Sequence, residues 1–127
     1  MTEAQRLKVK TYRDLLVWQK AMQLVTQIYS ITKELPREEL YGLISQIRRS
    51  SVSIPSNIAE GYGRNSRNDY LRFLQISMGS LFELQTQLEI CLNLKYLPEN
   101  NHSEMYEQSR EVERMLSSLI RKLNENK

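Results

Sequence analysis

The side chains that could carry out chemistry are few, because the 127-residue chain contains one histidine and one cysteine. His102 stands at the predicted start of a helix, where we expect it to be exposed. Cys91 falls on a predicted apolar helix stripe, where we expect a small buried side chain. A single histidine cannot supply a structural zinc site or the pair of Glu-x-x-His motifs that a two-metal site needs. We therefore predict a protein that is not an enzyme and that uses no metal or cofactor.

Arginine is the residue type that suggests binding. Five arginines form a basic cluster in the sequence: Arg48, Arg49, Arg64, Arg67 and Arg72. Guanidinium groups recognise phosphate, and Tyr62 is close enough in the sequence to stack on a base. Asp69 occupies the same predicted helix start as Arg67. Two interpretations remain open: a nucleic-acid site, or a solvated surface whose salt bridges face water or another subunit.

A stripe of polar side chains runs along one predicted helix at three- and four-residue spacing: Gln46, Arg49, Ser53, Asn57 and Glu60. It could line a ligand site. Alternatively, it could form an inter-helix polar network with Glu83 that satisfies the carbonyl group freed by Pro55. We keep both possibilities at this point.

Composition limits the class of protein. The net charge is +3, and 40% of the residues are hydrophobic and 26% charged, as in ordinary globular domains. We predict a basic flexible tail over residues 1–13 and one domain over residues 14–127. No signal-peptide pattern and no apolar run long enough to span a membrane is evident, so we expect a cytoplasmic protein without membrane contact.

Apolar periodicity predicts four helices, over about residues 14–33, 38–60 and 66–94 and from about residue 102 onward. Asp14, Ser66 and Asn101 are predicted to cap the first, third and fourth of them. Pro55 is predicted to kink the second helix without ending it, and Gly61, with Gly63, to terminate it.

The third predicted helix carries a seam in which apolar or small residues alternate at four- and three-residue spacing. The seam consists of Tyr70, Leu74, Ser77, Leu81, Leu84, Leu88 and Cys91. Such spacing is typical of antiparallel bundles, and the short connections predict an all-α, antiparallel up-down-up-down four-helix bundle. Two further apolar lines lie on other faces, one through Leu71, Met78 and Phe82 and one through Ile76, Ile90 and Leu94. A helix that is apolar on several faces is either central to its own fold or shared with another subunit.

Three segments carry a resemblance to a known family. These are residues 14–21, residues 39–61 with Pro55-Ser56-Asn57 near their end, and residues 73–84. They resemble the bacterial four-helix-bundle proteins encoded within intervening sequences of 23S ribosomal RNA genes. The resemblance covers about residues 12–97, and the run over residues 39–61 is the most specific part.

The resemblance implies a four-helix bundle that assembles as a homopentamer and has no catalytic activity. It also implies a relationship to the basic pentameric accessory proteins of diversity-generating retroelements, which bind a reverse transcriptase and nucleic acid. Our leading hypothesis is a homo-oligomeric adaptor that binds RNA through the arginines. The alternatives are a protein-interaction scaffold or reverse transcriptase accessory subunit without direct RNA contact, and a small-ligand sensor that uses the polar stripe.

Overall fold

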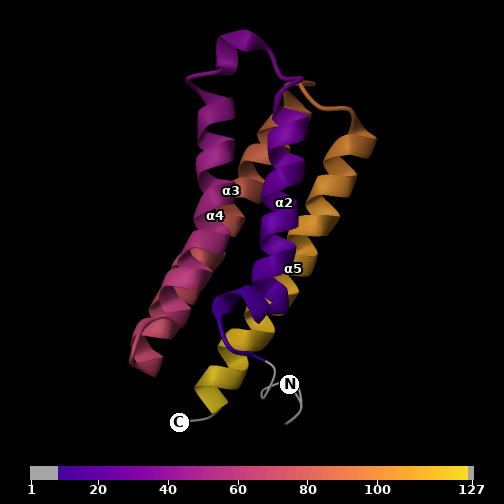
Figure 1. The fold of residues 1–127 in the computed structure, drawn as a ribbon. Coiled ribbons are helices and arrows are strands. Elements are labelled where there is room, and N and C mark those ends of the chain that lie inside the picture. The colour runs from indigo at the N-terminus through magenta and orange to yellow at the C-terminus, as the bar shows by residue number, and fades with distance from the viewer. Residues whose placement is uncertain (1–8, 126–127) are drawn as a thin grey trace.

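The computed structural model describes residues 9–125, and Figure 1 shows them as four long helices joined by short connections. The helices are α2 (Leu16–Thr32), α3 (Leu43–Tyr62), α4 (Arg67–Asn93) and α5 (Glu99–Glu125), preceded by the short 3-10 turn η1 (Tyr12–Asp14), with a second, η2 (Arg37–Glu39), between α2 and α3. The α2–α3 and α4–α5 connections lie at one end of the molecule and the α3–α4 turn at the other (Figure 1). The predicted all-α up-down-up-down bundle is therefore confirmed, and residues 9–125 contain no strand.

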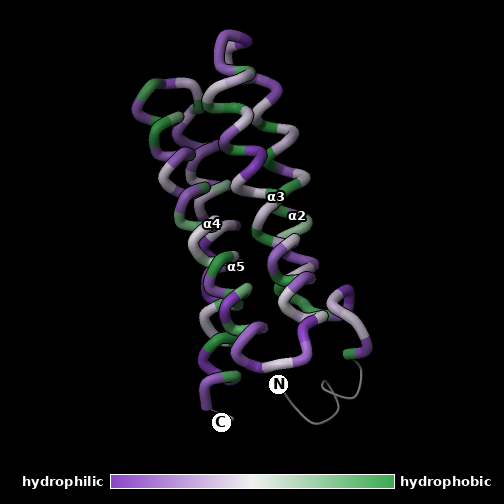
Figure 2. Tube along the Cα trace, turned by 90° about the vertical axis from the view of Figure 1, so that its left-hand side faces the viewer, coloured by the Kyte–Doolittle hydropathy of each residue, from purple (hydrophilic) through white to green (hydrophobic). Residues whose placement is uncertain are grey.

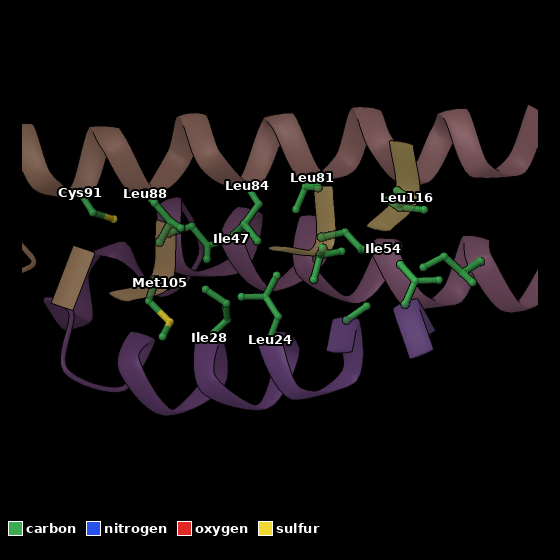
Figure 3. Packing of buried hydrophobic residues seen from close by; sticks show 14 of the residues in the cluster. Leu24, Ile28, Ile47, Ile54, Leu81, Leu84, Leu88, Cys91, Met105 and Leu116 are labelled. Carbon is green, nitrogen blue, oxygen red and sulfur yellow. The ribbon is translucent and has the colours of Figure 1, made fainter. Parts of the chain in front are cut away.

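The core is a column of aliphatic side chains along the bundle axis. Figure 3 shows its centre, made by Leu24 and Ile28 of α2, Ile47 and Ile54 of α3, Leu81, Leu84 and Leu88 of α4, and Met105 and Leu116 of α5. The α4 seam is buried as predicted, apart from the half-buried Tyr70. Each buried leucine or isoleucine contributes about 1.5–3 kcal/mol of transfer free energy, so this column dominates the stability.

The outer faces of the helices are polar. Figure 2 shows hydrophobic and hydrophilic stretches alternating along each helix, as expected where one face is buried and the other faces water. No helix within residues 9–125 is both long enough and apolar enough to cross a membrane.

The start of α2 differs from the prediction that Asp14 caps it. Leu15 is the N-cap residue and makes no side-chain cap hydrogen bond. The Asp14 carboxylate instead accepts the backbone N–H groups of Lys10 (2.9 Å) and Thr11 (3.2 Å), which keeps the pKa of Asp14 below its usual value. Of the predicted tail, residues 1–8 lie outside the described residues, whereas the stretch from Thr11 to Asp14 forms a capped turn.

Helix α3 is one continuous helix through Pro55, as predicted, and the bend at this proline stays a prediction. The helix begins at Leu43 instead of Glu38. The acidic residues around Glu38 form η2, and Gly42 then has a non-helical backbone (φ −109°, ψ −108°) that prevents the two helical segments from merging.

The prediction that Gly61 and Gly63 terminate α3 is wrong for Gly61 and confirmed for Gly63. The helix continues to Tyr62, and Gly63 is the C-cap residue. Gly61 is buried against α4, where a Cβ atom would lie 2.7 Å from the Phe73 Cβ and 3.3 Å from the Tyr70 carbonyl oxygen. The glycine therefore permits the close approach of α3 and α4.

Ser66 caps α4 as predicted, because its Oγ accepts the backbone N–H of Asp69 at 3.1 Å. The predicted cap at Asn101 is wrong. Helix α5 already begins at Glu99, and the His102 N–H donates to the Pro98 carbonyl at 3.0 Å. Pro98, three residues before the asparagine, supplies the carbonyl that accepts this first helical hydrogen bond and has no N–H group of its own to satisfy.

Candidate nucleic-acid interface

Three of the five predicted arginines meet at the turn between α3 and α4. Arg64 follows the C-cap residue of α3, Arg67 is the first residue of α4, and Arg72 lies on the next turns of α4. The Ser66 cap fixes where α4 starts and hence where the three side chains leave the backbone. We refer to Arg64, Arg67 and Arg72 as the arginine turn.

Phe73 organises the arginine turn. The guanidinium carbon of Arg64 lies 4.8 Å from the centroid of the Phe73 ring, and that of Arg72 lies 4.7 Å from it. The Phe73 residue is only 8% exposed, and Gly61 packs against its Cβ atom. A cation above an aromatic face gains about 0.5–1 kcal/mol at exposed sites. The two guanidinium groups are thus positioned before any ligand arrives.

Two acids accompany the arginine turn. Glu60 pairs with Arg64 at 2.9 Å, and Asp69 pairs with Arg72 at 3.7 Å. All four side chains are between 43% and 60% exposed, and exposed ion pairs contribute about 0–1 kcal/mol. Arg67 is exposed and forms no ion pair with any residue from 9 to 125. Because these ion pairs are weak, a phosphate can replace the carboxylate of Glu60 at Arg64 or that of Asp69 at Arg72.

Arg48 and Arg49 do not belong to the same cluster. Arg48 lies in α3, and Arg64 follows the end of α3 sixteen residues later. Sixteen residues span about 24 Å along a helix axis. The Arg48 Nε donates to the Thr32 Oγ1 at 2.9 Å, and its guanidinium group lies 4.7 Å from the Tyr29 ring centroid. Arg48 therefore ties α2 to α3, while Arg49 is exposed beside it.

Tyr62 is not a free stacking platform. It is half-buried, and its ring lies edge-on to the Tyr70 ring, with centroids 6.1 Å apart and an interplanar angle of 89°. Burial, with the nearby Tyr62 as a smaller cause, raises the pKa of Tyr70 to about 12. Both rings belong to the packing between α3 and α4.

One member of the polar stripe of α3, Ser53, makes a hydrogen bond to α4, as the inter-helix interpretation predicts. The Ser53 and Ser80 hydroxyl groups lie 2.8 Å apart, and the Asn57 Nδ2 donates to the Ser53 carbonyl at 2.8 Å. Glu83 accepts from the Gln87 Nε2 at 3.1 Å. The Ser53–Ser80 bond therefore connects α3 to α4, whereas the Asn57 bond lies within α3 and the Glu83 bond lies within α4.

Part of the predicted stripe behaves differently. Glu60 joins the arginine turn, and Gln46 is exposed. The expectation that the network satisfies the carbonyl freed by Pro55 also needs correction. Ser77 donates to the Ile54 carbonyl at 2.8 Å, which is three residues along the chain from the Ser51 carbonyl that loses its helical donor.

His102 is not exposed, contrary to the prediction. Its side chain is 12% exposed and stacks on Tyr106, with ring centroids 6.0 Å apart. The Nε2 atom lies 3.3 Å from the Glu89 Oε1, but the geometry is not that of a hydrogen bond. The α5 start at Glu99 explains the burial, because it turns this face of the first helical turn toward α4.

Cys91 is fully buried, as predicted, and burial, helped by the negative charge of Glu39, raises the pKa of its thiol from 9.0 to about 11. Since the thiolate is the reactive form, the folded protein should react with iodoacetamide at pH 8 at least about a hundredfold more slowly than the denatured chain. Mass spectrometry of timed samples measures this rate. Equal labelling rates with and without denaturant would contradict the buried thiol.

Phe73 takes part in this site, although its residue type gave no reason to predict a role in binding. It appeared in the sequence only as part of a family resemblance, next to Arg72. Its role depends on Arg64 approaching from the other side of the turn, which is a tertiary contact. The sequence signal for this role is the adjacent Arg72-Phe73 pair near a helix start, and such a pair by itself does not identify a binding site.

Comparison with known proteins agrees with the fold. Residues 13–118 match the family described as 23S rRNA-intervening sequence protein. A crystal structure of a protein with unknown function from the S23 ribosomal protein family, from Bacteroides thetaiotaomicron VPI-5482, superposes with a TM-score of 0.78 at 27% identity, covering 84% of this chain and 96% of that one. The search of curated proteins gave no match. The family match spans most of the chain, and the chain therefore belongs to the 23S rRNA-intervening sequence protein family.

Proposed function

We propose that this protein is a non-enzymatic RNA-binding adaptor that acts as a homo-oligomer. The observation that carries the RNA part is the arginine turn, in which one aromatic ring holds two guanidinium groups beside the exposed Arg67. A guanidinium group stacked by its face keeps its N–H edge available for a phosphate. Holding Arg64 and Arg72 in place also lowers the entropy lost on binding.

The names of the related proteins associate them with 23S ribosomal RNA genes or with a ribosomal protein family, without stating what they bind. The net charge of +3 favours a polyanion as well.

Several copies would strengthen such a site. A single turn with three arginines is a small electrostatic footprint, and symmetric repetition converts it into a larger one through avidity. Large side chains that remain exposed on α2 and α4, among them Met22, Ile76 and Leu94, supply surfaces for association. The family resemblance implies five copies.

The absence of catalysis is part of the proposal. Burial raises the pKa of the Cys91 thiol to about 11 and keeps it away from solvent, and the His102 side chain packs beside Glu89 and Tyr106. Neither group is available as an exposed nucleophile or base.

The RNA proposal is tested by replacing Arg64, Arg67 and Arg72 together with glutamine. Binding of a labelled single-stranded RNA of about 20 nucleotides should weaken at least about tenfold at 0.1 M salt. The slope of log K against log salt should flatten by about 2, since about 0.7 per lost phosphate contact is expected for single strands. Fluorescence anisotropy over a salt series measures both, and an RNA hairpin of the same length shows whether a structured RNA binds better.

The matched control removes the same charge from another surface. Arg114, Arg121 and Lys122 are exposed on α5, and their replacement by glutamine also lowers the net charge by three. This control should retain most of the affinity. Equal losses in the two variants would mean that only net charge matters, and no salt-dependent binding of the wild-type protein at micromolar concentration would refute the RNA proposal.

The second candidate is a protein-interaction scaffold or a reverse transcriptase accessory subunit without direct RNA contact. It is favoured by the exposed apolar side chains of α2 and α4. A pull-down that recovers a reverse transcriptase after nuclease treatment, from a protein that binds neither RNA probe, would favour this candidate over the first.

A further inference from the structure

An apolar pocket lies between the start of α2 and the C-terminal half of α5. Figure 1 shows the indigo end of α2 close to the yellow part of α5 there. The pocket has a volume of about 340 Å³, which lies within the range of about 300–1,000 Å³ that is usual for ligand sites. We call it the α2–α5 pocket, and its apolar walls consist of Leu15, Leu16, Val17, Met115 and Leu119.

Leu16 is the wall residue whose position the bundle alone does not explain. Leu15 and Val17 belong to the core, whereas Leu16 is 58% exposed, because neighbouring residues of a helix point about 100° apart. A single exposed leucine is ordinary in a folded protein. This leucine, however, continues the apolar wall of Met115 and Leu119, which are themselves only partly buried. The pocket therefore presents a connected apolar surface to solvent.

Two cations border the pocket without an anionic partner. Arg114 and Lys122 also line it, both are exposed, and neither forms an ion pair with any residue from 9 to 125. They are eight residues apart on α5, which corresponds to about 12 Å along the helix axis. Met115 and Leu119 lie between them in the sequence, so an apolar surface separates two positive charges.

The nearby acids of α5 do not neutralise these two cations. Glu111 pairs with Lys20 at 3.3 Å, and Glu113 pairs with Arg110 at 2.6 Å. Glu125 does not line the pocket and forms no ion pair with the part of the chain that the structure describes. The pocket therefore combines apolar walls with positive charge and has no acid among its lining residues.

We infer that the α2–α5 pocket binds one molecule of a fatty acid, that is, an aliphatic chain with a single terminal carboxylate. The chain covers Leu16, Met115 and Leu119, and the carboxylate pairs with Arg114 or Lys122, according to the direction in which the chain lies. Both cations form charge-assisted hydrogen bonds with carboxylates. RNA has no apolar chain that could cover these walls, so the site differs from the arginine turn and does not depend on the proposed function.

Decanoate is the probe, used below its micellar concentration, and isothermal titration calorimetry measures its affinity and stoichiometry on the full chain. One molecule should bind per chain. Affinity should rise by up to about fourfold per methylene group from octanoate to decanoate. Decan-1-ol, which has the same chain length without the charge, should bind at least about threefold more weakly than decanoate.

Two variants separate the apolar walls from the charges. Leu16→Asp places a negative charge in the wall and should weaken decanoate binding at least about tenfold. The position is exposed, and an aspartate suits the first turn of a helix, so this variant should fold. Replacing Arg114 and Lys122 together with glutamine removes both partners of the carboxylate and should weaken binding at least about threefold.

Each variant has a matched control outside the pocket. Leu40→Asp changes another exposed leucine, and the pair Arg37→Gln and Arg121→Gln removes two other exposed cations. Both controls should keep the wild-type affinity for decanoate, and so should the glutamine variant of the arginine turn. Circular dichroism establishes that all variants are folded.

Four results would overturn the inference. These are no saturable binding of decanoate, equal losses in the pocket variants and their controls, equal affinity for decanoate and decan-1-ol, and binding to vesicles of anionic phospholipid without binding of monomeric decanoate. A failure of RNA binding would leave the pocket unaffected, since the two sites are tested with different ligands and different variants.

Discussion

Replacing Gly61 with alanine is expected to lower the free energy of unfolding by about 1–3 kcal/mol. The added Cβ atom would lie 2.7 Å from the Phe73 Cβ and 3.3 Å from the Tyr70 carbonyl oxygen. Neither atom is the end of a flexible side chain, so α3 and α4 must move apart. Urea unfolding followed by circular dichroism measures the loss.

Gly63→Ala is the matched control for this substitution. A Cβ atom at Gly63 would meet only the carbonyl oxygens of Glu60 and Ala59, at 3.6 Å and 3.8 Å, and the backbone is right-handed with φ −78°. Alanine there should be neutral or stabilise by about 0.4–1 kcal/mol, because it restricts the unfolded chain. Comparable losses at both positions would show that the close approach of α3 and α4 is not what requires glycine at position 61.

The same substitution should also affect the arginine turn. The guanidinium groups of Arg64 and Arg72 lie over the Phe73 ring, and Gly61 allows Phe73 to lie close to α3. We therefore expect Gly61→Ala to weaken RNA binding at temperatures where the protein is still folded. Unchanged RNA affinity would indicate that the arginine turn still binds RNA when the Phe73 ring is displaced.

The second large effect concerns the hydrogen bond between Ser50 and Gln87. The Ser50 Oγ donates to the Gln87 Oε1 at 2.7 Å, and Gln87 is only 6% exposed. Ser50→Ala leaves this amide oxygen buried without that donor, which should cost about 1–3 kcal/mol of stability.

Removing both partners should cost less than this single change. The double variant Ser50→Ala with Gln87→Met replaces the pair with apolar groups of similar size, so it leaves no unpaired amide between α3 and α4. A double-mutant cycle of unfolding free energies gives the coupling between the two positions. Additive losses would mean that the two side chains do not act as a pair.

Much of the fold could be predicted because helix formation depends on residues close in the sequence. The seam from Leu74 to Cys91 follows the helical period, and a core-facing stripe is visible from one helix alone. The Ser66 cap is also local, since the bond to the Asp69 N–H spans three residues. The predicted caps were wrong where a neighbouring residue begins the helix instead. Leu15 replaces Asp14 as the N-cap residue of α2, and the first hydrogen bond of α5 is accepted by Pro98, ahead of Asn101.

The candidate site was predicted in part. The arginines were identified by type, and the structure divides them into the arginine turn and a second position at Arg48. Arg48 and Arg64 are sixteen residues apart, and a continuous helix keeps such residues about 24 Å from each other. Closeness in the sequence therefore overstated the size of the cluster. Similarly, the polar stripe was visible, but only the packing of α3 on α4 decided that Ser53 meets Ser80.

The amino-acid sequence alone is enough to predict a bundle of four amphipathic helices with few groups capable of catalysis and several arginines capable of binding. Those properties follow from residue types and from the 3.6-residue period, which are local. Only the tertiary structure decided that Phe73 joins Arg64 to Arg72, that Gly61 is a contact point between helices, and that His102 is buried. Each of these depends on the distance and rotation between two helices, and the periodicity of a single helix contains neither quantity.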